Sequence, residues 1–186
     1  MRHFRRVHDG LDVGPILAEL DAAPDLWNQF GERTASPDGP MAGTGDIWLR
    51  YFPRASLTGP EAYLREGRCE FYPAWRRLPS IHPVVFSLMG MCKGVELGGC
   101  LISRIPPGGE VKPHVDGAAW SARYYDAKYY VPLRSNARAI NACCDEEVNM
   151  RPSEIWTFNN LEPHAVYNLG QTDRVTLIVS MRSAGA

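Results

Sequence analysis

The spacing of apolar residues in the first half of the chain predicts two helices. Near residues 13–23 and again near 80–92, apolar side chains recur three or four positions apart and so share one helical face. Ser80 can cap the second helix. Residues 34–45 have the glycine and proline content of a loop, and we expect a strand after it at residues 46–52. The two apolar faces consist of Ile16, Leu17 and Leu20, and of Val84, Val85, Leu88 and Met89.

From residue 97 onward the pattern changes to short apolar stretches separated by turns such as PPGG at 106–109. We expect strands at residues 97–105, 110–116, 126–133, 137–144, 153–159, 164–169 and 173–181. Short strands at this spacing indicate antiparallel sheets in a sandwich or barrel. The predicted fold class is therefore mainly β with N-terminal helices packed on a jelly roll of the cupin-like kind.

The length and charge of the chain narrow the picture further. A chain of 186 residues fits one domain, in which residues 1–95 support a jelly-roll core at 96–183. The formal net charge of −1 gives no overall attraction to nucleic acid or to an anionic membrane. No stretch approaches the roughly 20 apolar residues that span a bilayer, and the basic N-terminus lacks the apolar run of a signal peptide. We therefore expect a cytoplasmic protein.

The number and spacing of the cysteines agree with a cytoplasmic protein. There are five, an odd number, and they follow no disulfide or zinc spacing. The adjacent Cys143 and Cys144 would point to opposite faces of a strand, as packing residues or spare thiols. Three histidines, His3, His8 and His82, have no partner at a meaningful spacing and are expected on the surface.

Three residues have the pattern of a metal site. His114 and Asp116 are two positions apart on a predicted strand, so their side chains leave the same face. His164 follows fifty residues later, near the start of another strand. Two histidines and one carboxylate form the facial triad of non-haem iron(II) oxygenases, which leaves open coordination positions. The competing interpretation is that each histidine is only a hydrogen-bonded residue and that the H-x-D triplet arose by chance.

Arg174 supports the interpretation that His114, Asp116 and His164 form a metal site and are not a chance pattern. It begins the strand that follows His164, and Thr176 lies on the same face. A guanidinium pairs with a carboxylate through two parallel hydrogen bonds, and a neighbouring hydroxyl adds a third donor. A dicarboxylate held by iron at one end needs such a partner at the other. The alternative is a surface arginine paired with Asp173.

At this point the sequence resembles a known family. The segments SRIPPGGEVKPHVD (103–116) and HAVYNLGQTDRVTLIVS (164–180) are similar to the two metal-binding stretches of the aspartyl/asparaginyl β-hydroxylase-like branch of the 2-oxoglutarate-dependent oxygenases. The resemblance covers roughly residues 97–181. It implies a double-stranded β-helix, iron(II), 2-oxoglutarate and O2, with succinate and carbon dioxide as co-products.

The resemblance also assigns roles to single residues. The metal positions fall on His114, Asp116 and His164, and the position that binds the distal carboxylate of 2-oxoglutarate falls on Arg174. Further co-substrate contacts fall on Ser103, Thr176, Lys128 and Tyr130, where Lys128 and Tyr130 replace an arginine and a histidine of the branch.

The substrate implied by the resemblance is an amino-acid side chain, free or within a peptide. The segment 117–125 follows the first metal ligands, where Trp120 could cover a substrate and Arg123 could pair with its acidic group. Two alternatives stay open: the same chemistry on a nucleic-acid base, and a cupin-type metal protein that is not an oxygenase. A basic groove for nucleic acid could only come from Arg50, Arg54, Arg65, Arg68, Arg76 and Arg77. Nothing in the sequence indicates an oligomeric state.

Overall fold

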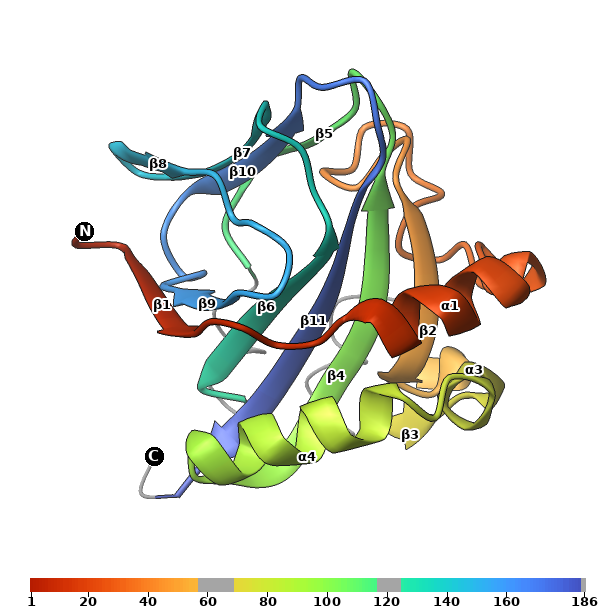
Figure 1. Cartoon of the computed structure of the whole chain (residues 1–186). Helices are drawn as coiled ribbons and strands as arrows, with labels where there is room; N and C mark the ends of the chain where they lie inside the picture. The colour runs from red at the N-terminus through yellow and green to blue at the C-terminus, as the bar shows by residue number, and fades with distance from the viewer. Residues whose placement is uncertain (57–68, 117–124, 185–186) are drawn as a thin grey trace.

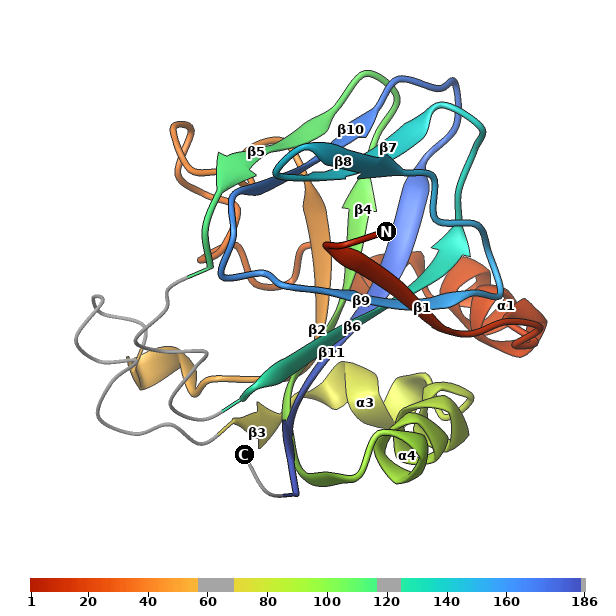
Figure 2. The same cartoon turned by 90° about the vertical axis from the view of Figure 1, so that its left-hand side faces the viewer.

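Two antiparallel sheets with helices on one side make up the computed structural model, which describes residues 1–56, 69–116 and 125–184 (Figure 1). The larger sheet has seven strands in the order β1-β9-β6-β11-β4-β2-β3, and the smaller has four in the order β5-β10-β7-β8. Figure 2 shows the smaller sheet at the top of the view, beyond one end of the long strands β4 and β11. This double-sheet jelly roll is the predicted fold class.

The elements have the following bounds. The larger sheet contains β1 (Phe4–His8), β9 (Ile155–Phe158), β6 (Ala127–Arg134), β11 (Arg174–Ser183), β4 (Gly94–Ile105), β2 (Gly45–Tyr51) and β3 (Glu70–Phe71). The smaller sheet contains β5 (Glu110–His114), β10 (His164–Asn168), β7 (Ala139–Cys143) and β8 (Glu146–Val148). The helices are α1 (Gly14–Ala22), α3 (Pro73–Arg77) and α4 (Ile81–Met91), with 3-10 turns at Pro24–Leu26 and Arg54–Ser56.

The larger sheet separates a hydrophobic core from a polar interior. Along β11 the odd-numbered Val175, Leu177 and Val179 are buried in the core that α1, α3 and α4 complete. The even-numbered Arg174 and Ile178 line a cavity on the opposite face, toward the smaller sheet. Because side chains alternate along a strand, one strand serves both regions.

The structure agrees with the predicted helices near 13–23 and 80–92 and with the seven predicted strands after residue 97, each within a few residues. Ser80 does not cap α4: its hydroxyl donates a hydrogen bond to Glu19 on α1 at 2.6 Å, so it joins two helices instead. The strands β1, β3 and β8 and the short α3 had no sequence signal that we recognised. Among the helices of the described residues, none has the length and apolar character that a membrane span requires.

Candidate metal centre and active site

The two sheets bring His114, Asp116 and His164 together. His114 ends β5 and His164 begins β10, and the two are directly opposite each other in the antiparallel register. Asp116 follows β5 by two residues. One carboxylate oxygen, Oδ1, lies 3.5 Å from Nε2 of His114 and 3.9 Å from Nε2 of His164. One donor atom from each residue lies within 4.8 Å of the others, so the three can ligate a single ion.

Both imidazoles are oriented by backbone carbonyls. Nδ1 of His114 lies 2.8 Å from the carbonyl oxygen of Lys112, and Nδ1 of His164 lies 2.9 Å from that of Glu162. A carbonyl can only accept, so each Nδ1 carries the proton and each Nε2 presents a lone pair to the cluster. Burial lowers the pKa of His164, which keeps its ring neutral. Nε2 of His114 is buried without a hydrogen-bond partner among the described residues.

Asp116 is held through its other oxygen. Oδ2 accepts hydrogen bonds from the Lys128 ammonium and, at 2.7 Å, from the Asn160 amide. Burial alone would raise the pKa of Asp116, but His114, Lys128 and Asn160 together hold it well below its usual range. The group is therefore a carboxylate at neutral pH, with Oδ1 facing the two imidazoles. Two neutral imidazoles and one carboxylate fit a non-haem iron(II) site, and the orphaned Nε2 of His114 is the position that an ion would satisfy.

At the other end of the same cavity, polar donors are buried without partners. The Arg174 side chain is only 3% exposed, and its Nη2 donates to Oδ1 of Asn141 at 2.7 Å. Its Nε and the Thr176 hydroxyl have no partner among the described residues. Ser103 lies opposite Thr176 in the β4–β11 register and is also buried. Burial lowers the pKa of Arg174 to about 10, so the guanidinium stays charged at neutral pH. Unpaired buried donors are costly, and a carboxylate would satisfy them.

Most of the residues expected from the sequence meet around this one cavity. Its lining includes His114, Asp116, His164, Arg174, Ser103, Tyr130 and Lys128. Thr176 is buried on the same strand as Arg174, two residues along. Lys128 lies at the metal end, paired with Asp116, and not at the distal end with Arg174. Trp120 and Arg123 belong to residues 117–124, outside the described part of the chain.

The sequence did not predict three residues that hold or line the candidate site. Asn160 holds Asp116, and Asn141 holds Arg174. Arg33, from the loop before β2, lines the cavity while its Nη1 contacts the two carboxylate oxygens of Asp46 at 2.8 and 2.6 Å. None of the three stands at a motif spacing from its partner, so only the fold reveals them.

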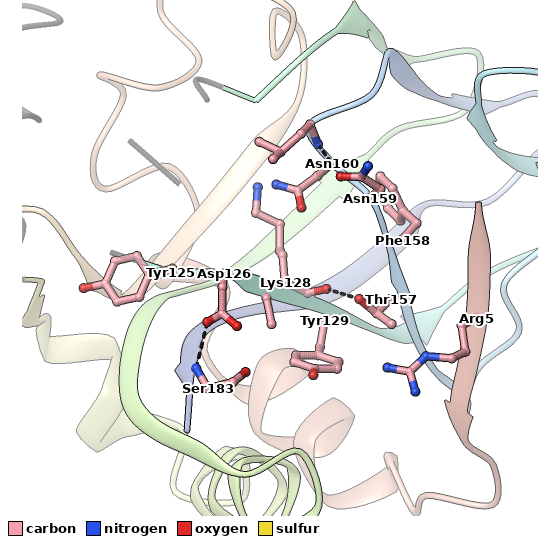
Figure 3. Close-up of a pocket in the computed structure, with 12 residues that line it drawn as sticks. Arg5, Tyr125, Asp126, Lys128, Tyr129, Thr157, Phe158, Asn159, Asn160 and Ser183 are labelled. Carbon is pink, nitrogen blue, oxygen red and sulfur yellow. Dashed lines mark hydrogen bonds between the residues drawn. The ribbon is translucent and has the colours of Figure 1, made fainter. Parts of the chain in front are cut away.

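A second pocket has a volume of about 320 Å³ (Figure 3). Lys128 and Phe158 line both cavities. The Thr157 hydroxyl donates to the carbonyl oxygen of Lys128 at 2.9 Å, which fixes β6 against β9 at the pocket wall. Tyr125, the first described residue after 117–124, also lines it, so the two flanks of that segment lie at the metal cluster and at this pocket.

Comparison with solved structures shows the same fold elsewhere. A prolyl hydroxylase from Trichoplax adhaerens, in complex with a hypoxia-inducible factor peptide, is 12% identical over 97% of this chain and 84% of its own (TM-score 0.63). A prolyl-4-hydroxylase from Pseudomonas putida is 14% identical over 98% and 94% (0.58). The viral collagen prolyl hydroxylase of Paramecium bursaria Chlorella virus-1, in its 2-oxoglutarate complex, is 9% identical over 98% and 97% (0.56).

Comparison of the sequence with known families identifies the family of this chain. No curated protein has a sequence that matches this chain. The family model of the aspartyl/asparaginyl β-hydroxylases matches residues 55–183, well over half of the chain. The chain therefore belongs to the aspartyl/asparaginyl β-hydroxylase family and is a 2-oxoglutarate- and iron(II)-dependent dioxygenase.

Proposed function

We propose that the chain hydroxylates an amino-acid side chain that carries a carboxylate, free or within a peptide. In this proposal His114, Asp116 and His164 hold the iron, and Arg174 binds the distal carboxylate of 2-oxoglutarate. The observation that carries it is the single cavity with metal donors at one end and buried, unpartnered donors at the other. The metal donors alone give no reason for the buried, unpartnered donors of Arg174 and Thr176. A dicarboxylate bound to an ion would contact both groups of residues.

The residues of the chain have three tasks in this reaction. When bound, iron(II) and 2-oxoglutarate supply the activation of O2 that puts one oxygen atom into a substrate C–H bond and yields succinate and carbon dioxide. The carbonyls of Lys112 and Glu162 keep the imidazole lone pairs directed at the ion. Arg174, with Ser103 and Thr176, fixes the direction of the co-substrate. Apolar side chains between the two ends keep water out of the cavity, namely Ile105, Val111, Phe158, Val166 and Ile178.

The charge around the cavity supports an acidic substrate. Three cationic side chains, Arg33, Lys128 and Arg174, face two carboxylates, Asp46 and Asp116, which leaves one positive charge. The two charges of iron(II) are balanced by the two of 2-oxoglutarate. One net positive charge thus remains near the cavity in the loaded enzyme, and a buried net charge is unfavourable. A substrate with one carboxylate would neutralise it.

The sizes of the two cavities support different contents. The cavity around the metal donors measures about 50 Å³ and is the smaller of the two. Lys128 lines both cavities and so lies at the boundary with the 320 Å³ pocket. The larger pocket lies in the lower range of small-molecule sites and suits an amino-acid side chain. The peptide bound by the Trichoplax adhaerens prolyl hydroxylase is in line with a peptide substrate.

The alternative substrate, a nucleic-acid base, has less support. Of the six arginines that could have formed a basic groove, Arg65 and Arg68 lie outside the described residues. Arg54 pairs with Glu32 and Arg77 with Asp25, while Arg50 donates to the Cys69 carbonyl. A cupin-type protein without oxygenase activity would have no use for the unpaired donors of Arg174 and Thr176.

A turnover screen tests the substrate class. The iron-loaded chain would be incubated with 2-oxoglutarate, O2 and three panels: aspartyl peptides, their asparaginyl counterparts, and single-stranded oligonucleotides with methylated bases. We expect succinate formation coupled to the gain of one oxygen atom, strongest for the aspartyl peptides. Coupled oxidation confined to the oligonucleotides would contradict the proposal.

Variants at Trp120 and Arg123 test the segment that follows the metal ligands. Because this segment starts beside Asp116, we expect Trp120→Ala and Arg123→Ala to form succinate without matching amounts of hydroxylated product. Arg76→Ala, an exposed arginine on α3, is the matched control and should stay fully coupled. Full coupling in both test variants would remove the segment from substrate binding.

A further inference from the structure

A second cluster of metal-binding side chains lies one strand away from the catalytic one. His3 precedes β1, Cys143 ends β7, and Cys144 stands in the turn between β7 and β8. One imidazole nitrogen and the two sulfur atoms lie within 4.8 Å of one another. The sequence had placed His3 on the surface without a partner and the cysteines as packing residues or spare thiols. The structure instead brings all three together, although more than 140 residues separate His3 from Cys144.

The chain holds His3 at this place by its backbone. The Glu146 carboxylate accepts hydrogen bonds from the backbone N–H groups of Arg2 at 2.6 Å and His3 at 2.8 Å. The His3 side chain is 16% exposed, and its Nε2 lies 3.2 Å from Oδ1 of Asp145, a possible fourth ligand beside the two sulfurs. Both Nε2 and Oδ1 accept hydrogen bonds from the exposed Arg2 guanidinium, which an ion would have to displace. The β7–β8 hairpin thus supplies both the anchor for the N-terminal segment and three of the four possible ligand groups.

The backbone at Cys144 is unusual for its residue type. Its φ of 52° lies in the left-handed region, which glycine, asparagine and aspartate populate far more readily. A two-residue hairpin turn favours those residues for the same reason. Cysteine at this position is conformationally unfavourable, yet it places a second sulfur beside that of the fully buried Cys143. Strained positions of this kind are typical of binding sites.

We propose that His3, Cys143 and Cys144, with Asp145 or a water as the fourth ligand, bind one zinc(II) ion. Zinc prefers this mixture of sulfur and nitrogen donors in a tetrahedral arrangement, whereas the catalytic cluster has no sulfur and suits iron(II). Zn–S distances of about 2.3 Å and Zn–N distances of about 2.0 Å place the ligand atoms roughly 3.5–3.8 Å apart. The ligand atoms of the cluster lie within 4.8 Å of one another, so each pair has to approach by at most about 1.3 Å.

Binding has a chemical consequence and a structural one. Both thiols lose their protons to solvent when the sulfur–zinc bonds form. The ion ties the N-terminal segment to β7, whose Cys143 pairs in register with His164 on β10. The site is independent of the proposed substrate and of the catalytic metal.

The experiment uses the full chain without a histidine tag, stripped of metal and kept reduced. Titration with Co(II), a spectroscopic substitute for zinc, should give a thiolate-to-cobalt charge-transfer band and the visible spectrum of a tetrahedral ion. Cys144→Ser and His3→Ala should each weaken this binding by at least 10–100-fold, the loss typical of even outer-shell changes. Cys92→Ser, a partly buried cysteine elsewhere, and the double variant His114→Ala/His164→Ala should both keep the band.

A second readout covers the case in which a variant is poorly folded. Zn(II) should raise the thermal midpoint of the His114→Ala/His164→Ala variant, which lacks the catalytic cluster, and leave that of the same variant unchanged when His3→Ala is added. The proposal is overturned if the reduced chain gives no charge-transfer band, or if the band is unaffected by Cys144→Ser. It is also overturned if mass spectrometry finds Cys143 and Cys144 joined in a disulfide and reduction does not restore metal binding.

Discussion

Asp116 illustrates, at the scale of single residues, how the two oxygens of one carboxylate can be given different tasks. Oδ2 is occupied by Lys128 and Asn160, whereas Oδ1 faces the Nε2 atoms of His114 and His164. A carboxylate with both oxygens free could rotate or bind an ion through both. The two hydrogen-bond donors therefore act as positioning residues for a single metal-facing oxygen.

Removing one donor should weaken metal binding. We expect Asn160→Ala to lower the affinity for Mn(II), a redox-silent substitute for iron, by on the order of 10–100-fold, because the hydrogen bond at 2.7 Å is lost. Isothermal titration of the metal-free chain measures this. Asn159→Ala is the matched control, since its side chain accepts a hydrogen bond from the Leu161 N–H and has none to Asp116. Equal losses in the two variants would mean that only the loop conformation matters.

The two-residue period of a strand predicted that Arg174 and Thr176 share a face on β11. The same period predicted His114 and Asp116 together, although β5 ends at His114 and Asp116 lies two residues beyond it. Asn160, Asn141 and Arg33 could not be predicted, because each meets its partner through a contact between segments without a fixed spacing. Lys128 was predicted as a site residue, but only the structure shows that it pairs with Asp116.

At the scale of elements, β1 shows the limit of sequence patterns. Its sequence, FRRVH, has apolar residues only at Phe4 and Val7, three positions apart, so it lacks the alternation of a strand. It forms because β9 offers a free edge and because Glu154, just before β9, pairs with Arg6 at 2.9 Å. The strands after residue 97 were predictable because most of them carry their own apolar pattern.

The stability contributed by Glu154 should depend on pH. Burial alone would raise its pKa from the ordinary 4.5, but the Arg151 N–H, the Trp156 indole and Arg6 together lower it. A carboxyl with a lowered pKa stabilises the fold above its ordinary pKa and loses that contribution as the pH falls through the lowered value. We expect Glu154→Gln to reduce the free energy of unfolding by about 1–2 kcal/mol at pH 7, the loss of charged hydrogen bonds.

Urea denaturation at a series of pH values down to about pH 4 tests this dependence. The difference between the parent chain and Glu154→Gln should be constant from pH 7 to about pH 5.5 and should shrink below that. Glu147→Gln, an exposed carboxyl on β8, is the control and should stay within about 0.5 kcal/mol of the parent chain throughout. A difference that is independent of pH would attribute the effect to packing instead of charge.

At the scale of the whole molecule, the candidate active site joins the two sheets. The smaller sheet supplies His114 and His164, whereas the larger one supplies Arg174, Thr176 and Ser103. Helices cover the other face of the larger sheet, and the space between the sheets holds the cavity beside a second apolar cluster. An ion would contact the smaller sheet and Asp116, and only a co-substrate long enough to reach Arg174 would connect both sheets.

Stepwise ligand binding should therefore stabilise the fold in two separable increments. Mn(II) at about 100 times its Kd adds about 2.7 kcal/mol, and 2-oxoglutarate at a similar excess adds as much again. For a chain of this size each increment corresponds to a rise in Tm of roughly 5–10 °C.

His164→Ala should lose both increments. Arg174→Lys keeps the charge but loses the guanidinium fork, so it should keep the metal increment and lose most of the second. The expected loss of affinity for 2-oxoglutarate is on the order of 2–5 kcal/mol. Arg138→Lys, an exposed arginine before β7, is the matched control for the exchange. Increments, and not absolute Tm values, are compared, because Arg174→Lys also disturbs the hydrogen bond to Asn141 and lowers the starting Tm. A full second increment in Arg174→Lys would show that the distal carboxylate binds elsewhere and that Arg174 serves the fold alone.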